Sequence, residues 1–486
     1  MGMLAWRTLE NGGAFNTVTE PDPADISKDR ARFLTWWSPG QYLVPGVFTR
    51  LGLRLGSALT ITTGLALLGC LLGWIRVAKH FALSPQAATL LVVFMSTFRY
   101  STISFHTYNG GEILLQGVTP WLILAGCRVP AVSAAQAAWL AGLVVLVGFF
   151  AKLTGLIVAG ASLIAGAAAA YRRLRRIGSG MLGGAAGAIV ACGLLYVTWF
   201  SRGTTPGSGH GWFLARRAVI FALAAPWGAG VSWEDLMTSF LPGLQNPSTV
   251  LWYLLPAFFF ATIILLGWRK RTGDAKLSEL ITIAICFYGV CVSAMAVIYL
   301  RGGSVSLEER HFRSAGTLIF VCVLAVADTL PRNAMGRLAV LTFCGLMSIN
   351  GVVLMARDAR LAKRENIDPY SRTRQDEMDI RAVEFASAAF AREGRDDIFV
   401  LQRSGVASAF PPDARILVAQ LLDEPESAIA AMRYAGRVRG RVYIAMQTAI
   451  AQTVKGTLLL NLFEEYPFNA WERHQFGNTT VFVQAR

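Results

Sequence analysis

The chain has 486 residues, of which 54% are hydrophobic and only 15% are charged, and its mean hydropathy is +0.47. Soluble domains carry about 25% charged residues, so this composition excludes an ordinary soluble protein and indicates a polytopic membrane protein. A net charge of +15 would suggest a nucleic-acid partner in a soluble chain. Here the basic residues lie between apolar runs, as the positive-inside rule produces, so we expect no nucleic-acid partner.

The first polar segment, residues 10–42, precedes the first apolar run and is rich in carboxylates, among them Glu10, Asp22 and Asp25. Its Gly and Pro residues favour turns, and Trp36 and Trp37 suit an interface with the membrane. A helix entering a membrane directly would need none of these residues. We interpret the segment as a folded loop at the membrane surface that carries part of an active site.

Apolar windows long enough to cross the roughly 30 Å core of a bilayer recur along the rest of the chain. They cover residues 55–75, 84–100, 112–128, 133–150, 154–171, 180–200, 249–267, 278–299, 314–330 and 338–356. We therefore expect about ten spans. We expect one more upstream of Met1, because a first loop on the outer side of the membrane needs a segment that translocates it.

The loops between these windows alternate between the two sides of the membrane. Nearly all the basic residues of the short loops fall on one side, which the positive-inside rule makes the cytoplasmic side. They are Arg76, Lys79, Arg128, Arg172, Arg173, Arg175, Arg176, Arg269, Lys270, Arg271, Lys276, Arg332 and Arg337. The first loop and everything after Ala356 are then extracytoplasmic.

The outward loops contain further residues able to do chemistry. His106 and Glu112 lie six residues apart beside an apolar window, where burial is costly, so we expect them to face a wet cavity. The loop over residues 300–313 places Arg310 and His311 close to two glutamates. A tight turn holds Lys152 at the outer headgroup level.

After Ala356 the sequence changes in character. Short β-rich runs alternate with helical patterns, and they predict a small α/β domain. The predicted strands are residues 398–401, 416–418, 442–444 and 481–483, and the predicted helices are residues 375–392, 425–436 and 447–457. The sequence thus predicts a mainly α fold, a polytopic transmembrane helix bundle with a small C-terminal α/β domain. The domain boundaries we expect are 1–54, 55–356 and 357–486.

The hairpin between the fourth and fifth windows carries Gly148, Lys152, Thr154 and Gly155. It resembles the hairpin with a Gly followed by a Lys that is common in GT-C glycosyltransferases, such as the protein mannosyltransferases and the aminoarabinose transferase of lipid A. In those enzymes an acidic motif, usually Asp-Glu, lies in the first outer loop about 30 residues before a Pro-containing entry to the next span. Here residues 38–43 resemble that entry, and the acidic position falls near Glu10, although the Asp-Glu pair is not intact.

The resemblance implies an enzyme that moves a hexosyl or pentosyl group, with inversion, from a polyprenyl-phosphate donor to a lipid, glycan or protein acceptor. A carboxylate would deprotonate the acceptor, and cations would stabilise the departing phosphate. The candidate bases are, in order, Glu10, Asp22 and Asp25. The candidate phosphate-binding residues are Lys152, Arg310 and His311, and the candidates for contact with the acceptor or a metal are His106 and Glu112.

Other interpretations stay open at this point. The aspartates of the first loop are also suited to capping a short helix over residues 24–35, and Lys152 to reaching the headgroups as an ordinary interfacial lysine. A transporter or flippase of a lipid-linked glycan, or a non-catalytic scaffold, fits the same composition. No cofactor is required by the sequence, and a divalent metal ion remains open. The expected location is the bacterial inner membrane, among membrane lipids.

Overall fold

A computed structural model describes most of the chain. The described residues are 2–106, 108, 110–203, 212–240, 251–270, 274–301, 305, 307–331, 334–368, 373–374, 378–393, 396–402, 404–411, 413–419 and 426–484. They form two compact units, one made of Met1–Leu59 with Ala359–Arg486 and the other of Thr60–Asp358. The predicted first loop and the predicted C-terminal domain therefore belong to one unit.

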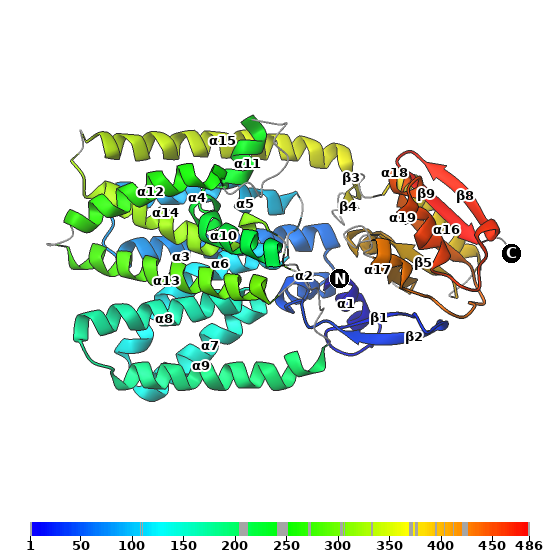
Figure 1. The fold of residues 1–486 in the computed structure, drawn as a ribbon, viewed down its shortest axis with the longest axis horizontal. Helices are drawn as coiled ribbons and strands as arrows, with labels where there is room; N and C mark the ends of the chain where they lie inside the picture. Colours follow the sequence, from blue (N-terminus) through cyan, green and yellow to red (C-terminus); the bar gives the residue numbers. More distant parts are fainter. Residues whose placement is uncertain are drawn as a thin grey trace. The chain divides into compact units, whose positions relative to one another are not determined.

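The second unit, called here the helical unit, is a bundle of helices (Figure 1). Its helices are α3 (Leu55–His80), α4 (Pro85–Thr97), α5 (Arg99–Thr102), η1 (Ile103–Phe105), α6 (Gly111–Arg128), η2 (Val129–Ala131), α7 (Ala134–Ala151), α8 (Gly155–Leu174), α9 (Ser179–Thr198), η3 (Phe200–Arg202), α10 (Trp212–Ala229), α11 (Trp233–Phe240), α12 (Leu251–Lys270), α13 (Ala275–Leu300), η5 (Glu309–Phe312), α14 (Arg313–Asp328) and α15 (Met335–Glu365). The first residues of α3 and the last of α15 belong to the other unit.

Among the described residues, eight helices are long and apolar enough to cross a membrane, which makes the chain an integral membrane protein. A ninth span results if α4 and the segment Arg99–Phe105, which meet at a bend of 50°, cross together. Of the ten predicted windows, the one at 249–267 falls on α12, of which Tyr253–Leu265 is an apolar stretch within the described residues. The predicted fold class, a mainly α transmembrane bundle with a small α/β domain, is confirmed.

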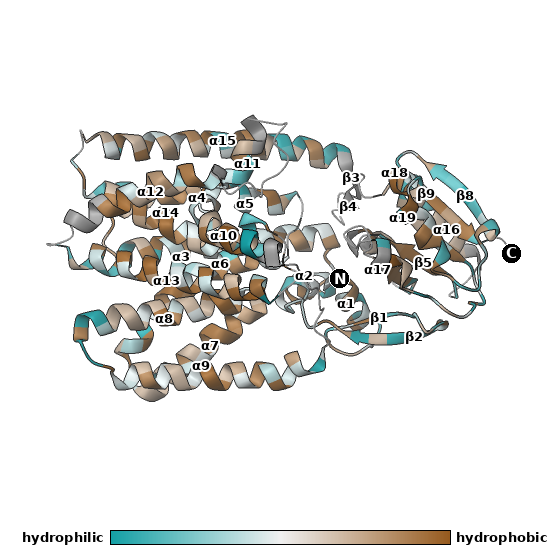
Figure 2. Ribbon diagram, in the orientation of Figure 1, coloured by the Kyte–Doolittle hydropathy of each residue, from teal (hydrophilic) through white to brown (hydrophobic). Residues whose placement is uncertain are grey.

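The burial of the helices shows which of them lie inside the bundle. In α14 the apolar window is 89% buried, whereas in α15 it is 22% buried and in α9 it is 28% buried. Most exposed residues of α9 and of residues 335–356 of α15 are apolar, as Ile189, Val190, Ile349 and Val353 illustrate, and Figure 2 shows these parts largely in brown and white. Apolar side chains left outside the bundle are suited to contact with lipid. α14 is its central helix.

The first unit, called here the sheet unit, is built on a five-stranded sheet of order β6-β5-β7-β9-β8. β5 (Ile398–Leu401), β6 (Arg415–Val418) and β7 (Val442–Gln447) pair in parallel, while β9 (Thr479–Gln484) and β8 (Trp471–Phe476) join antiparallel. The predicted strands match β5, β6, β7 and β9. The unit also contains α16 (Ile380–Glu393), η6 (Ser404–Ala409), α17 (Glu426–Ala430), α18 (Thr448–Ala451), α19 (Val454–Asn461), η7 (Phe468–Ala470) and the short strands β3 (Asn366–Asp368) and β4 (Thr373–Arg374).

Both faces of this sheet are covered, as the central strand β5 demonstrates. All of its side chains are buried, and they alternate between two apolar clusters. Phe399 and Leu401 pack in one cluster, and Ile398 and Val400 pack in the other. A strand places successive side chains on opposite faces, so a continuous apolar run suits a strand buried on both sides.

The predicted first loop forms α1 (Gly2–Glu10), the hairpin of β1 (Thr17–Asp22) and β2 (Asp25–Phe33), and α2 (Gly40–Arg50). The alternative of a helix over residues 24–35 is wrong, because this stretch is mostly β2. The hairpin tip bonds to the rest of its unit: the Ile26 amide donates to the Ala435 carbonyl, and the Ala435 amide donates to the Pro23 carbonyl. Arg415 also pairs with Asp29 at 2.7 Å.

Candidate active site

The turn between α7 and α8 is formed by two glycines in close approach. A Cβ atom on Gly148 would lie 2.5 Å from the Gly155 carbonyl oxygen, and one on Gly155 would lie 2.0 Å from the Gly148 carbonyl oxygen. Real Cβ atoms do not approach backbone oxygens this closely, so only glycine allows the two helices to meet here. α7 ends at Ala151 and α8 begins at Gly155, which leaves Lys152 in the turn as the sequence predicted.

Glu112 is brought to this turn by the packing of α6. A Cβ atom on Gly111 would lie 2.8 Å from the Ala151 carbonyl oxygen, so the first turn of α6 packs directly against the end of α7. As a result the Lys152 ammonium donates to the Glu112 carboxylate, and both side chains are largely buried. Burial lowers the pKa of Lys152 below 10.5, while the charge of Glu112 acts in the opposite direction.

The η5 segment adds two further predicted residues to the same place. Arg310 Nε lies 3.9 Å from Glu112 Oε1 and 2.5 Å from Glu308 Oε2. His311 interacts electrostatically with Lys152, Glu112 and Arg310. The structure therefore brings together four of the predicted site residues. With Arg313 they define what we call the charged cluster: Glu112, Lys152, Arg310, His311 and Arg313.

Arg313 is the cluster member that was not among the predicted site residues. It is 8% exposed, and its guanidinium carbon lies 2.9 Å from the centre of the Tyr100 ring. Its Nε and Nη1 atoms have no hydrogen-bond partner among the described residues. Arg313 also stands at the first residue of α14, where the helix dipole is positive and repels a cation. A buried guanidinium with free donors in such a position is suited to binding an anion.

Glu309 anchors the segment that carries these cations. It is fully buried, and its carboxylate accepts hydrogen bonds from the Tyr100 hydroxyl at 2.8 Å and the Glu234 amide at 3.2 Å. Burial raises the pKa of Glu234, and the neighbouring carboxylates of Asp235 and Glu308 act in the same direction. These contacts tie η5 to α5 and α11, so the orientation of Arg310 and His311 depends on Glu309.

A second ion-pair network holds the adjacent helix ends together. Arg99, at the start of α5, pairs with Asp358 on α15, and its Nε atom lies 3.5 Å from Asp235 Oδ1. The side chains of Arg99 and Asp358 are each 10% exposed. Charged groups buried to this degree remain ionised only when paired, so the network fixes α5, α11 and α15 relative to one another.

The charged cluster lies at the opposite end of the bundle from the predicted cytoplasmic loops. α8 begins just after Lys152 and ends at the basic residues Arg172 to Arg176. Its 20 residues span about 30 Å, which is the thickness of the bilayer core. If the basic end faces the cytoplasm, the charged cluster is at the outer side of the membrane.

The carboxylates of the first loop lie in the sheet unit. Glu10 is exposed at the end of α1. Asp22 accepts a hydrogen bond from the Ala24 amide at 3.0 Å, and Asp25 accepts from the Ser27 hydroxyl at 2.6 Å, so both stabilise the turn of the hairpin. Hydrogen bonds from Ser27 and Lys28 lower the pKa of Asp25 from 3.8 to about 2.

The remaining predicted residue, His106, closes the η1 turn, where its amide donates to the Ile103 carbonyl at 2.9 Å. In the described part of the chain, no group of three or more His, Cys, Asp or Glu side chains is arranged to hold a metal ion. Glu112, its predicted partner in acceptor or metal contact, is paired with Lys152 instead.

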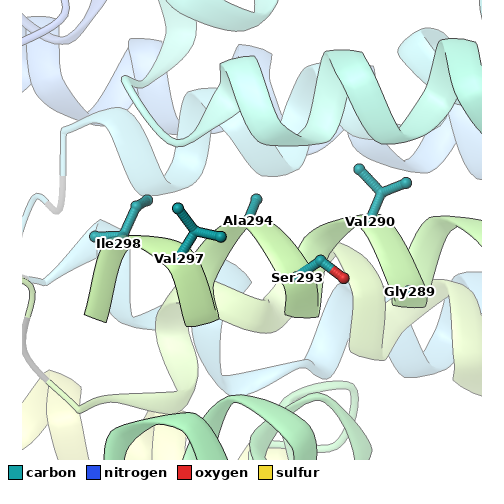
Figure 3. Close-up of a pocket in the computed structure, with 6 residues that line it drawn as sticks. All are labelled: Gly289, Val290, Ser293, Ala294, Val297 and Ile298. Carbon is teal, nitrogen blue, oxygen red and sulfur yellow. The ribbon is translucent and has the colours of Figure 1, made fainter. Parts of the chain in front are cut away.

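An apolar groove of about 540 Å³ lies along α13. Figure 3 shows Val290, Ala294, Val297 and Ile298 on one side of this helix, and Gly289 and Ser293 complete the lining. The groove occupies the half of α13 that leads to Leu300, close in sequence to η5. Its small and branched apolar side chains are suited to contact with a hydrocarbon chain.

The chain is similar to ArnT from Cupriavidus metallidurans. Two crystal structures of that protein, one bound to undecaprenyl phosphate and one in the apo state, each align with 99% of this chain and 92% of theirs, at a TM-score of 0.48 and with 12% and 13% identity. ArnT is the lipid A aminoarabinose transferase named by the sequence resemblance. A TM-score below 0.5 carries no residue roles over to this chain.

No family model and no curated protein matches the chain. The roles of its residues therefore rest on their own geometry. Tyr100 is the positioning residue that the sequence analysis missed, whereas Glu309 is one of the two glutamates that it noted beside Arg310 and His311. The available signal was the placement of an Arg-Tyr pair and a Glu-Glu-Arg-His run at the ends of apolar windows, where ionisable residues are seldom accidental.

Proposed function

We propose that the chain is a membrane glycosyltransferase that moves a sugar from a polyprenyl-phosphate donor to a lipid, glycan or protein acceptor at the outer face of the membrane. The observation that carries the proposal is the charged cluster. Lys152, Arg310 and Arg313 converge there at one end of the bundle, and Arg313 keeps two buried N–H donors unpaired. A phosphate at the headgroup level would accept these donors and neutralise the excess positive charge.

The chemistry requires little from the protein at the donor. The acceptor hydroxyl loses its proton to a carboxylate, its oxygen attacks C1 of the sugar, and the bond between C1 and the phosphate oxygen breaks. Polyprenyl phosphate leaves with the electron pair as a stable anion. Cations placed where this charge develops lower the barrier, and in a water-poor site they act more strongly than in water. Glu112 orients Lys152 for this role, and His311 is a further donor to the phosphate.

We place Glu10 first among the candidate bases, ahead of Asp22 and Asp25. A general base works best when its pKa approaches the working pH. The carboxylate of Asp25, with a pKa of about 2, is a weak proton acceptor. Asp22 and Asp25 also hold the hairpin turn by hydrogen bonds. Glu10 is exposed to solvent and has no such structural task in the described contacts.

The proposal includes the membrane setting. The protein would lie in the bacterial inner membrane, with residues 357–486 extracytoplasmic and the charged cluster at the outer leaflet. His106 would contact the acceptor. A divalent metal ion is not required by this mechanism, because Lys152, Arg310 and Arg313 supply the positive charge that the leaving phosphate needs.

Purified protein in lipid nanodiscs, incubated with a panel of polyprenyl-phosphate sugars, tests the proposal directly. Release of polyprenyl phosphate, measured by mass spectrometry, is expected with the wild-type protein. Arg313→Met should abolish release, and Arg176→Met, which removes an exposed arginine at the predicted cytoplasmic end, is the matched control. Binding of the donor without any release by the wild-type protein would instead favour a transporter of lipid-linked glycans or a non-catalytic scaffold.

A further inference from the structure

A small pocket in the sheet unit lies between α1, α2 and η6. It has a volume of about 150 Å³, and its lining includes Trp6, Glu10, Leu4 and Phe410. One water occupies roughly 10–15 Å³ of such a volume, so the pocket has room for a body the size of a six-membered ring. Most of the lining is apolar, which favours an apolar body over a fully hydrated one.

The pocket contains a buried donor that no described group satisfies. Trp6 is 5% exposed, yet its indole Nε1–H has no hydrogen-bond partner among the described residues. The six-membered ring of this indole packs on Gly46, where a Cβ atom would lie 2.4 Å from it, and Arg50 stands 5.3 Å from the ring centre. The indole is thus fixed in place. Buried polar groups in native proteins are almost always paired, so the free N–H points to a ligand.

A ligand group that accepts a hydrogen bond from Trp6 Nε1–H in this pocket must also be able to approach Glu10. Trp6 and Glu10 are four residues apart on α1, so both side chains lie on the same face of the helix. The other charged group of the pocket, Arg7, is already occupied, since it donates to the carbonyls of Ala407, Pro411 and Ala414. The Glu10 carboxylate and the unpaired Trp6 N–H are therefore the two polar groups of the lining through which a ligand can be recognised.

The chemistry of these two groups selects the ligand. Trp6 Nε1 only donates, and an ionised Glu10 only accepts. An ammonium group would satisfy Glu10 but could not accept from the indole, and an anion could accept from the indole but could not donate to Glu10. A hydroxyl group satisfies both, because its oxygen accepts from Nε1–H while its proton is donated to the carboxylate.

We propose that this pocket binds a hydroxyl group carried on a ring-sized, mostly apolar body, with Trp6 and Glu10 as its hydrogen-bond partners. The proposal that this hydroxyl belongs to the acceptor rests on the function proposed above, in which Glu10 is the base. In that case Trp6 holds the acceptor oxygen while Glu10 takes its proton. Trp6 is then a substrate-binding residue in the sheet unit.

Fluorine NMR on protein labelled with 5-fluorotryptophan in nanodiscs tests binding without any transfer reaction. The signals of Trp6 and Trp36 are assigned by Trp6→Phe and Trp36→Phe. Cyclohexanol, the probe, should shift the Trp6 signal saturably and leave that of the exposed Trp36 unchanged. Methoxycyclohexane, which accepts but cannot donate a hydrogen bond, should bind at least about tenfold more weakly, because the hydrogen bond to a charged carboxylate is lost.

Variants that fill the pocket complete the experiment. Thr49→Met and Ala407→Leu each place extra carbons in the lining and leave Trp6 and Glu10 intact, so each should abolish the saturable shift. An unchanged signal from Trp471, a residue assigned by Trp471→Phe and packed against Phe463 and Tyr466 in the same unit, shows that the variant is folded. A shift that grows linearly with cyclohexanol, or one that persists in a folded filled variant, overturns the proposed pocket.

The binding result and the transfer result are separable. Saturable binding of cyclohexanol by a protein that transfers no sugar would leave the hydroxyl-binding site standing and remove its assignment to the acceptor. Loss of turnover in Glu10→Gln together with no saturable shift in the wild-type protein would leave Glu10 as a base and overturn the pocket as the place where the hydroxyl binds.

Discussion

The Lys152 ammonium and the Glu112 carboxylate form an ion pair between residues 40 positions apart, at the turn after α7 and in the first turn of α6. Their side chains are 17% and 10% exposed. An ion pair this buried stabilises a site chiefly by avoiding an unpaired charge. The pair therefore has a structural effect and, in the proposed mechanism, a catalytic one, and the two effects can be separated.

A double-mutant cycle separates them. Lys152→Met and Glu112→Leu should each lower the free energy of unfolding by about 3–5 kcal/mol, because each leaves the other charge buried and unpaired. The double variant should lose much less stability than the sum. Donor binding should stay weak in the double variant, since Lys152, one of the three cations of the charged cluster, is gone. Thermal unfolding measures the structural effect, and binding of polyprenyl phosphate measures the catalytic one. Restored binding in the double variant would mean that Lys152 is only an interfacial anchor and does not bind the phosphate.

The same lysine predicts the pH dependence of donor binding. Burial lowers the pKa of Lys152 below 10.5, and the ammonium form binds the phosphate. The cation is present below this lowered pKa and disappears as the pH rises through it, so affinity should begin to fall at a lower pH than an ordinary lysine would give. In Lys152→Arg the fall should move beyond the measurable range, because a guanidinium stays charged. An identical profile for both proteins would contradict the assignment.

Some of this arrangement was predictable from sequence and some was not. The turn at Lys152 could be predicted, because Gly148 and Gly155 flank it and apolar windows lie on both sides. The pairing of Lys152 with Glu112 could not be predicted, since it depends on the packing of Gly111 against Ala151. This contact joins two distant apolar windows, and the periodicity of a local sequence pattern does not predict such contacts. Arg313 was overlooked for the same reason, because its partner ring, Tyr100, lies in another segment.

The first loop shows a different limit. Asp22 and Asp25 enclose a Pro-Ala turn, which is a hairpin signal, but β2 exposes most of its side chains and so lacks the alternation of apolar and polar residues that marks a strand. The hairpin is stabilised instead by pairs such as Glu20 with Arg32 at 2.8 Å and by bonds to residues more than 380 positions away, including Asp29 with Arg415. Contacts of that range are invisible in a single sequence.

Replacements at Tyr100 test how Arg313 is held. Tyr100→Phe removes the hydroxyl that donates to Glu309 and keeps the ring beneath the guanidinium, whereas Tyr100→Leu removes both. A desolvated contact between a cation and an aromatic ring contributes about 2 kcal/mol, or roughly 30-fold in affinity. Donor binding should therefore survive in Tyr100→Phe and weaken up to about 30-fold in Tyr100→Leu. Equal binding by both variants would mean that the ring does not position Arg313 for the phosphate.

Two glycines of α8 give a matched test of the hairpin. Gly155→Ala places a methyl group against the Gly148 carbonyl and should destabilise the protein by at least about 1–3 kcal/mol through overpacking. Gly160→Ala meets nothing within 4 Å on the same helix and should be neutral or stabilising by up to about 1 kcal/mol. Thermal unfolding in nanodiscs compares them. Equal melting temperatures would show that the approach of α7 and α8 is looser than the structure has it.

The choice of base is tested by amide variants of the first-loop carboxylates. Glu10→Gln keeps the shape of the side chain and removes the proton acceptor, so turnover should fall by about 10²–10⁴-fold while donor binding stays near the wild-type value. Asp25→Asn and Asp22→Asn should reduce turnover far less, and any loss should follow the stability of the hairpin, since these carboxylates accept hydrogen bonds from Ser27 and Ala24.

Ser27→Ala supplies the control, because it raises the pKa of Asp25 from about 2 without removing the carboxylate. If Asp25 were the base, Ser27→Ala would increase turnover at neutral pH and move the acid limb of the pH profile to higher pH, and Asp25→Asn would abolish turnover. Wild-type rates in all the amide variants would move the base to another carboxylate, with Glu112 and Glu309 the next to test.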